Sequence, residues 1–397
     1  MSQFRVEVHP RISGIAPDDW DRCAGADNPF VSHAFLLALE ESKSACAETG
    51  WQPQHLTLKN PDGQILACAP LYLKSHSYGE YVFDWSWANA FERAGGQYYP
   101  KLQCAVPFTP VTGPRLLIAP ENRTEQQDLR LALINAMLQL LQQYQASSLH
   151  LTFTREDEWQ SLAQPGLLPR TGVQYHWENK GYGGFEDFLS DLSSRKRKAI
   201  RKERREANSH GLTLKTLEGE TLTPTILEQF HGLYLNTVDK KHAHDYLTRD
   251  FFSRLGQQLA GQVVLTSAWN GGQLIAAALN LRGSDTLYGR NWGSTGHYPS
   301  LHFELCYYQA IDYAITHGLK RVEAGAQGEH KIQRGYMPSR TYSLHAIADP
   351  NFRDAIARFL EGEQRALEQD MSYLKELGPF RKTAANAPSD SLRQPKD

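Results

Sequence analysis

Residues 301–338 read LHFELCYYQAIDYAITHGLKRVEAGAQGEHKIQRGYMP, and this stretch decides the fold class. Apolar residues recur at helical spacing over Leu301–Thr316, which predicts a helix. A short strand, Arg321–Ala324, follows the helix, and a glycine-rich turn follows the strand. In α/β proteins, ligands collect at the carboxyl ends of strands. We therefore predict an α/β fold with a mixed sheet, and a functional site in the turn after Arg321–Ala324.

This turn carries many side chains that can do chemistry. A solvated charged loop would have the same composition, but the glycines at 325, 328 and 335 favour a shaped site. The candidate site residues of this segment are Glu323, Gln327, His330, Lys331, Arg334 and Tyr336.

The order of elements recurs about 200 residues apart along the chain. A β-hairpin is predicted around Asp62-Gly63, and a second around Gly271-Gly272. The segment GQILACA at 63–69 matches GQLIAAA at 272–278, and a Tyr-Pro step occurs at 99–100 and at 298–299. Two unrelated hairpins are the alternative. The repeat predicts two tandem domains, 1–170 and 171–380, and the polar composition of 381–397 predicts a disordered tail.

The first half contains its own block of aromatic and charged residues. Glu80–Ala88 is predicted to be an aromatic strand. Aromatic rings mixed with charges, glycine and proline are typical of a lined pocket, although a rigid structural loop would look similar. The candidate substrate-binding residues here are Asp84, Trp85, Arg93, Tyr99 and Lys101. We expect the site to lie in a cleft between the domains, built from this block and from 290–336.

Composition narrows the classes of function. The chain has 397 residues and a net charge of −2, so no global field attracts nucleic acid, and stable DNA binding is not expected. Five scattered cysteines form no CxxC pair, which favours a reducing cytoplasm. No long apolar run occurs, so no membrane span is expected. His242 and His244 are close in sequence, but no third ligand is evident, and we predict no metal site.

One helix is strongly basic. The segment 193–207 reads SSRKRKAIRKERREA, and eight of the eleven residues from Arg195 to Arg205 are Lys or Arg. A helix with so few apolar residues is not an ordinary buried element. Three interpretations stay open: a solvated linker helix, a patch for a phosphate-rich ligand such as tRNA, or attraction to an anionic membrane surface.

Several blocks of the sequence resemble known proteins. The segment 192–214 resembles the start of the second domain in FemABX-type aminoacyltransferases, and Lys331–Tyr336 resembles their Phe-Lys-x-Gly-Phe ending. The blocks at 83–117, 287–293, 301–315 and 323–338 are similar to the bacterial FemAB-like family of GNAT-type N-acyltransferases, over residues 5–375. The resemblance implies two GNAT-like (acyl-CoA N-acyltransferase) domains and a role in peptidoglycan-precursor metabolism.

Acyl transfer to an amine requires a base, a group that stabilises the oxyanion and a pocket that aligns the partners. Candidate bases are Glu323, His330, Glu304 and His302. Arg290, Lys331 and Arg334 are candidates for binding an anionic group or the oxyanion, and Trp292 and Tyr336 for walling the pocket. The donor stays open between an acyl-CoA and an aminoacyl-tRNA. The alternatives are an acyl-CoA- or acyl-carrier-dependent enzyme acting on a small molecule or lipid, and a non-catalytic module that binds cell-wall precursors or an anionic partner.

Overall fold

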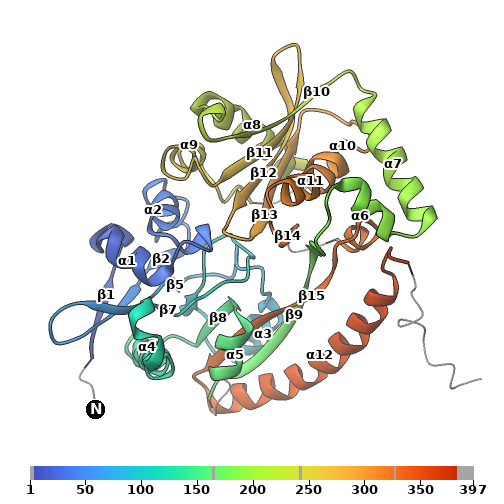
Figure 1. Cartoon of the computed structure of the whole chain (residues 1–397). Helices are drawn as coiled ribbons and strands as arrows, with labels where there is room; N and C mark the ends of the chain where they lie inside the picture. Colours follow the sequence, from blue (N-terminus) through green and yellow to red (C-terminus); the bar gives the residue numbers. More distant parts are fainter. Residues whose placement is uncertain (1–3, 163–165, 241–243, 326–327, 382–397) are drawn as a thin grey trace, which may run out of the picture.

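The computed structural model describes residues 4–162, 166–240, 244–325 and 328–381, and Figure 1 shows their arrangement. Eleven strands form one large mixed sheet in the order β10-β11-β12-β13-β14-β9-β15-β8-β6-β5-β2, and a smaller sheet has the order β1-β3-β4-β7. The large sheet therefore runs through both halves of the chain. This confirms the α/β fold with a mixed sheet.

The strands are β1 (Arg5–His9), β2 (Trp51–Pro53), β3 (His55–Lys59), β4 (Ile65–Ala69), β5 (Leu71–Lys74), β6 (Lys101–Cys104), β7 (Leu117–Ile118), β8 (Ser148–Thr154), β9 (Leu168–Glu178), β10 (Thr213–Glu218), β11 (Val263–Asn270), β12 (Gln273–Arg282), β13 (Thr286–Ser294), β14 (Arg321–Glu323) and β15 (Met337–Ile347). The α-helices are α1 (Pro17–Ala24), α2 (His33–Glu41), α3 (Trp85–Arg93), α4 (Gln126–Gln143), α5 (Glu156–Leu162), α6 (Phe185–Asp191), α7 (Ser194–Asn208), α8 (Pro224–Lys240), α9 (Arg249–Gln258), α10 (Leu301–Phe303), α11 (Gln309–Thr316) and α12 (Pro350–Glu376). Short 3₁₀ or π turns used below are η2 (Pro29–Val31), η5 (Glu304–Tyr308) and η6 (Glu329–Arg334).

The second half is an antiparallel meander that ends in a parallel pair. Strands β11, β12 and β13 pair antiparallel, and β14 then pairs parallel to β13. The chain between β13 and β14 forms α10, the π turn η5 and α11, whose buried face includes Leu301, Leu305 and Ile311. The helix and strand predicted from residues 301–324 are confirmed.

The first half follows the same plan. Strand β6 pairs antiparallel to β5 and parallel to β8, and α4 makes the connection between β6 and β8. Both halves therefore contain a helical crossover between two parallel strands, which agrees with two GNAT-like units. The hairpin of this half is divided between the two sheets at Gln54 and Pro70, and Pro70 has no N–H to donate to a strand ladder.

The two halves exchange strands at the junction. Strand β9 follows β8 in sequence but pairs with β14 of the second half, and β15 follows β14 but pairs with β8 of the first half. The two exchanged strands also pair with each other over Met337–His345. The predicted domain boundary at 170/171 falls inside β9. Of the predicted tail, Arg381 donates its backbone N–H to Asp191 O, and 382–397 lie outside the described residues.

One expectation for the first half was wrong. Glu80–Ala88 is not a strand, because residues from Trp85 onward form helix α3. Trp87 and Phe91, four residues apart, lie on one side of that helix and pack in a cluster with Ile356 and Leu360 of α12. The two Tyr-Pro steps are not equivalent: Tyr298-Pro299 precedes helix α10, whereas Tyr99-Pro100 precedes strand β6.

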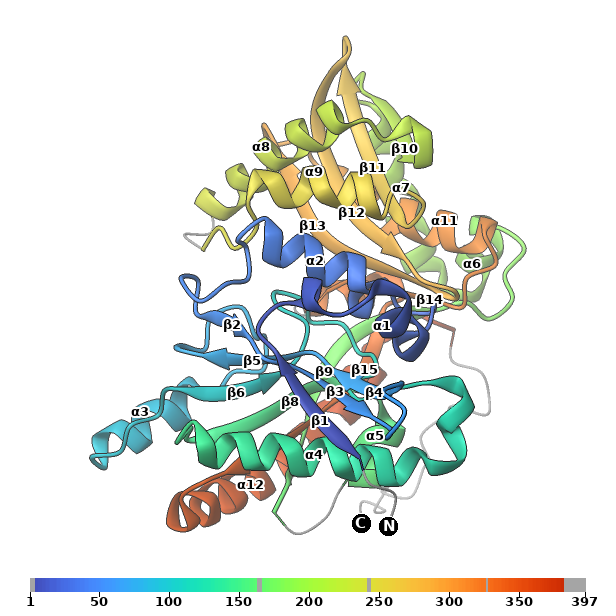
Figure 2. The same ribbon diagram turned by 90° about the vertical axis from the view of Figure 1, so that its left-hand side faces the viewer.

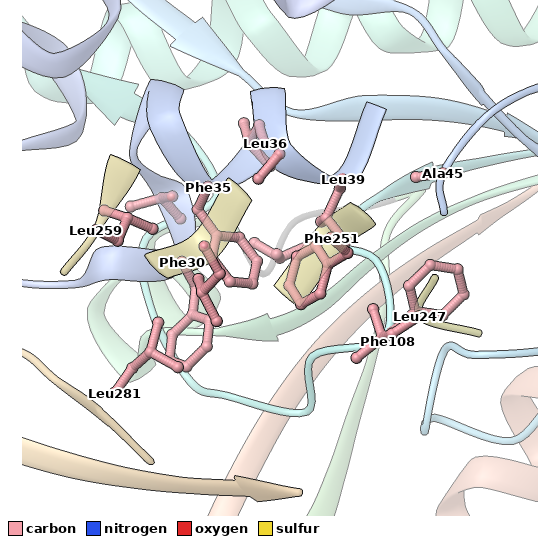
Figure 3. Packing of buried hydrophobic residues seen from close by; sticks show 14 of the residues in the cluster. Phe30, Phe35, Leu36, Leu39, Ala45, Phe108, Leu247, Phe251, Leu259 and Leu281 are labelled. Atoms are coloured by element: carbon pink, nitrogen blue, oxygen red, sulfur yellow. The ribbon is translucent and has the colours of Figure 1, made fainter. Parts of the chain in front are cut away.

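A shared hydrophobic core joins the halves. Figure 3 shows Phe30 and Phe35 of η2 and α2 packed with Phe251 of α9 and with Leu281 of β12. The rings of Phe35 and Phe251 lie 5.9 Å apart in an edge contact. Figure 2 shows α2 lying directly beneath the sheet and helices of the second half. In the part of the chain described here, no helix is both long enough and apolar enough to cross a membrane.

Candidate active site

A cleft opens where β13 and β14 diverge. The two strands pair only over Thr286–Tyr288 and Arg321–Glu323. Beyond this point β13 continues beside β12, and the chain after β14 turns away through Ala324 and Gly325. The cleft has a volume of about 460 Å³ and is lined by both halves, including Tyr81 and Phe108 from the first. A cleft between the halves is thus present, and the first half lines it with other residues than those predicted for the site.

His330 lies in this cleft within a cluster of rings. Its Nε2 is 3.0 Å from the hydroxyl of Tyr307, and the ring of His302 packs edge-on to Trp292 at 5.1 Å. All four side chains line the cleft. Burial lowers the pKa of His330, and the positive charges of Arg334 and Lys331 lower it further. His330 is therefore a neutral imidazole at pH 7 and is able to accept a proton.

Lys331 also lines the cleft and is nearly buried. Its Nζ donates a hydrogen bond of 3.0 Å to Gly325 O, in the turn after β14. Gly335 ends η6 with a φ of 93°, where an added Cβ would lie 2.8 Å from Phe188. Glycine is therefore required at the turn that leads from Lys331 into β15.

Arg334 and Tyr336 support the cleft from behind. Arg334 Nη1 donates to His330 O at 2.8 Å, Nη2 donates to Glu203 of α7 at 2.9 Å, and the guanidinium lies 3.4 Å from the ring centre of Phe303. The hydroxyl of Tyr336 donates to Tyr307 O at 3.1 Å. Both side chains are buried and fix the backbone beside His330 and Tyr307, and neither lines the cleft.

Arg290 links the two halves at the point where β13 and β14 diverge. It is the extra residue of the bulge in β13, and its Nη2 donates to Phe108 O at 2.5 Å. Burial lowers the pKa of Arg290, but an arginine remains charged at neutral pH. Asn280 lines the same cleft, and its buried Oδ1 has no hydrogen-bond partner among the described residues.

Glu304 is placed elsewhere. Its side chain is fully buried and accepts hydrogen bonds from Arg204 at 3.0 and 3.1 Å and from Gln309 at 2.8 Å. It therefore anchors α7 to the helix that crosses from β13 to β14. Glu323 also does not line the cleft, because its side chain borders a second cavity. Gln327 lies outside the described residues.

The polar block of the first half is a buried ion cluster. Lys101 contacts the carboxylates of Asp84 and Glu80, the latter at 2.8 Å. Burial opposes the charge on Asp84, but Lys101 outweighs it and lowers the pKa of Asp84. Burial raises the pKa of Glu80 to about 7 despite the same lysine. Both the lysine and the two carboxylates are closed off from solvent in this structure, where they contact one another.

The remaining candidates of this block do not line the cleft either. Tyr99 is half-buried and its hydroxyl is 2.9 Å from Ser77 Oγ. Trp85 packs against Tyr78, with ring centres 4.7 Å apart. Arg93 is exposed at the end of α3. This end lies at the edge of the molecule in Figure 2.

Sequence reasoning missed several residues of the cleft. Tyr307, Asn280, Tyr81, Tyr234 and Tyr246 all line it. Tyr307 could have been predicted, because it lies in the predicted helix 301–316 one turn after Phe303. Tyr234 and Tyr246 come from α8 and from the segment before α9, and no motif connects them with the turn at 325–335. In the described part of the chain, no group of three His, Cys, Asp or Glu side chains is placed to hold a metal ion.

The predicted basic helix is α7, at the right in Figure 1. Its inner side packs on the cleft elements, because Glu203 binds Arg334 and Arg204 binds Glu304. Its outer side carries four exposed basic residues spaced three or four apart, namely Arg195, Lys198, Lys202 and Arg205. Such spacing places them on one side of the helix, and we call this set the basic stripe.

The fold and the cleft together define an α/β protein of two GNAT-like units with a cleft between them. The chain belongs to the FemAB-like family, described as peptidoglycan biosynthesis/recognition, whose model matches residues 11–382. No match is found among curated proteins.

Solved structures show the same fold at low identity. The structure of FemX matches with a TM-score of 0.52 and 11% identity, over 89% of this chain and 100% of that one. The C-terminal domain of a putative lysylphosphatidylglycerol synthetase from Agrobacterium fabrum matches with a TM-score of 0.53 and 9% identity, over 86% of this chain and 96% of that one.

Proposed function

We propose that this protein is an N-acyltransferase that moves an aminoacyl or acyl group onto an amine of a peptidoglycan precursor. The observation that carries the proposal is the cleft at the β13–β14 divergence, where a neutral histidine and a lysine lie on one short segment. The family's peptidoglycan description supports the class of acceptor. The fold shared with FemX supports the type of reaction.

The chemistry assigns one role to each group. The acceptor amine attacks the carbonyl carbon of the donor, a C–N bond forms, and the bond to the leaving oxygen or sulfur breaks. His330 takes the proton that the attacking nitrogen loses. Lys331, beside it in sequence, stabilises the negative charge that develops on the carbonyl oxygen. The hydroxyl of Tyr307 lies 3.0 Å from His330 Nε2 and holds the imidazole in place.

We propose an aminoacyl-tRNA as the donor to test first. The basic stripe of α7 presents Arg195, Lys198, Lys202 and Arg205 to solvent, and α7 packs directly on η5 and η6 of the cleft. The stripe faces away from η5 and η6 but lies on the helix whose inner side packs against them, so a polyanion bound along it would lie next to the elements that form the cleft. An acyl-CoA is the alternative donor. We place the reaction in the cytoplasm, because all five cysteines are free thiols.

The test is a transfer assay with a UDP-linked muropeptide as acceptor and either aminoacyl-tRNA or acyl-CoA as donor, read by the mass gain of the acceptor. Lys331→Met is expected to lower kcat by about 10²-fold or more with folding intact. Lys320→Met, an exposed lysine outside the cleft, is the matched control and is expected to retain activity. Absence of transfer with both donors, or full activity of Lys331→Met, would contradict the proposal.

The pH profile checks the role of His330. The reaction needs the neutral imidazole, and burial together with Arg334 and Lys331 lowers the pKa of His330 below the ordinary 6.5. Activity is therefore expected to fall as pH decreases, along a limb whose midpoint lies below 6.5. His330→Gln should abolish this limb and leave a slow, pH-independent rate. A limb that persists in His330→Gln would assign the base to another group.

A further inference from the structure

A second cavity of about 370 Å³ lies at the junction of the two halves. Three adjacent strands form its buried floor, because Tyr288 of β13 is in register with Glu323 of β14, and Glu323 is in register with His176 of β9. The walls come from β15 and from first-half loops near Asn28 and Gly113. Tyr288, Glu323 and His176 point to one face of the sheet, since Val322 and Trp177 alternate with them into the core on the opposite face.

The carboxyl of Glu323 is held in this floor with one oxygen, Oε2, that has no hydrogen-bond partner among the described residues. The residue is 4% exposed. The nearest basic atoms, His176 Nε2 at 3.9 Å and Arg321 Nη1 at 4.0 Å, are beyond hydrogen-bonding distance. Nδ1 of His176 is likewise buried without a partner in the described structure. Burying a polar atom without a hydrogen bond costs free energy, and two such atoms at one cavity indicate a ligand.

The charges around the cavity select the kind of ligand. The rim carries the carboxylates of Asp27, Glu156 and Asp285. Two arginines of the lining are bound to carboxylates outside it: Arg155 to Asp157 at 3.0 Å and Arg321 to Glu178 at 2.6 Å. Arg340, also in the lining, is exposed at the rim. Asp285 is likewise bound outside the lining, to Lys320 at 3.4 Å, so the charges of the rim largely cancel. The ionised form of Glu323 in the floor is then the charge that a ligand has to compensate, and a cation compensates it.

We propose that this second cavity binds a primary ammonium group, with Glu323 as its counter-ion. A compact ammonium donates three hydrogen bonds in different directions. A carboxylate oxygen, an imidazole nitrogen and the hydroxyls of Tyr288 and Thr286 are present in the floor to receive them. A planar guanidinium prefers a bidentate carboxylate, and a quaternary ammonium prefers an aromatic cage. The site is separate from the cleft assigned to acyl transfer, and the proposal does not depend on that activity.

Binding of the ammonium should release a proton. Burial raises the pKa of Glu323 to about 8, with Arg321 and Arg290 opposing and Glu178 and Asp285 reinforcing the shift. Burial also lowers the pKa of His176 to about 3, so this neighbour is neutral. Tyr288, the other neighbour, is neutral as well, because burial raises its pKa. Without a ligand, Glu323 is therefore mostly protonated at neutral pH, and a bound cation favours its ionised form.

The experiment is calorimetric titration of the full chain with 1-aminopentane. Pentan-1-ol and pentylguanidine serve as uncharged and planar controls. The amine should bind with release of nearly one proton at about pH 7 and almost none at about pH 10, measured in buffers of different ionisation enthalpy. The alcohol and the guanidine should bind about tenfold more weakly or not at all.

Variants locate the site. Glu323→Gln keeps the shape of the side chain and should weaken amine binding by about tenfold or more and remove proton release. Asp285→Asn, at the rim, should weaken binding by a smaller factor and serves if Glu323→Gln fails to fold. Glu329→Gln, an exposed carboxylate beside the cleft residue His330, should leave binding unchanged. Equal binding of the amine and the alcohol, binding without proton release at about pH 7, or equal affinity of wild type, Glu323→Gln and Asp285→Asn would overturn the proposal.

Discussion

At the residue scale, neighbours in space decide what each charged side chain does. Lys331 and Lys101 are both nearly buried lysines, yet Lys331 lines the cleft and Lys101 is enclosed by Asp84 and Glu80. Glu323 and Glu304 differ in the same way. Glu304 is bound by Arg204. Oε2 of Glu323 borders a cavity instead and has no hydrogen-bond partner among the described residues. The residue type makes a side chain a candidate for the site, and its neighbours in the fold determine its role.

The ion cluster of the first half gives a prediction at this scale. Lys101→Met would leave Asp84 and Glu80 buried without their shared cation, and should lower the free energy of unfolding by about 3–5 kcal/mol. Lys59, half-exposed and paired with Glu7 at 2.6 Å, is the matched control. Lys59→Met should lower the free energy of unfolding by about 1 kcal/mol or less. Urea unfolding followed by circular dichroism measures both values.

A role of Lys101 in substrate binding would give a different result. In that case Lys101→Met would unfold at nearly the wild-type urea concentration and would show a raised KM for the acceptor. The structure leads us to expect the reverse: a less stable protein whose remaining folded fraction binds the acceptor normally.

At the element scale, α7 shows how a charged helix is fixed in place. Its sequence predicted a helix but not its orientation, because basic residues occur on every side. The buried Glu304 selects one side by pairing with Arg204, which also reaches Asp312 at 2.9 Å. Glu203 of the same helix binds Arg334 behind the cleft. Arg195, Lys198, Lys202 and Arg205 lie on the outer side and face solvent as the basic stripe.

This orientation predicts unequal effects of two arginines in one helix. Arg204→Ala leaves Glu304 buried and uncompensated, and should lower the free energy of unfolding by about 3 kcal/mol or more. Arg201 pairs with Glu186 on the surface, where 45% and 70% of the two side chains are exposed. Arg201→Ala should therefore change stability by about 0.5 kcal/mol or less. Thermal unfolding of both variants checks the prediction, and similar losses for the two would contradict the orientation of α7.

At the scale of the whole molecule, the exchange of β9 and β15 makes the two halves interdependent. Each half completes the sheet of the other, and Phe30 and Phe35 share a core with Phe251. The junction also creates both cavities, since residues of each half line them. A site between the halves therefore requires both to be folded.

Cooperative unfolding is the expected consequence. Hydrogen exchange measured by mass spectrometry along a urea series should show peptides of β4 and of β12 losing protection in one common transition. Chains cut at the predicted boundary, 1–170 and 171–397, should not fold alone, because 1–170 lacks β15, which pairs with β8, and 171–397 lacks Phe30 and Phe35, which complete the core around Phe251. Two separate transitions, or a folded fragment, would show that the exchanged strands are dispensable.

Much of the fold was predictable because it depends on local patterns. The period of apolar residues indicated the helix 301–316, and the turn residues indicated the hairpins around 62–63 and 271–272. The strand predicted for Glu80–Ala88 was wrong, because aromatic residues suit both strands and helices. Only the contact of Trp87 with α12 distinguishes a helix from a strand here. Strands β9 and β15 were not recognised, because their partners lie far away in sequence.

The sequence by itself determined the α/β class, the recurring order of elements and the basic helix, and it singled out the segment 290–336 as the candidate site. These follow from periodicity, composition and spacing, which act over a few residues. Only the tertiary structure decided that His330, Lys331 and Tyr307 line one cleft, that Asp84 and Lys101 stabilise a buried cluster, and that Glu323 borders another cavity. The physical reason is that burial and pairing set the charge and role of an ionisable group, and both depend on strands that meet from opposite ends of the chain.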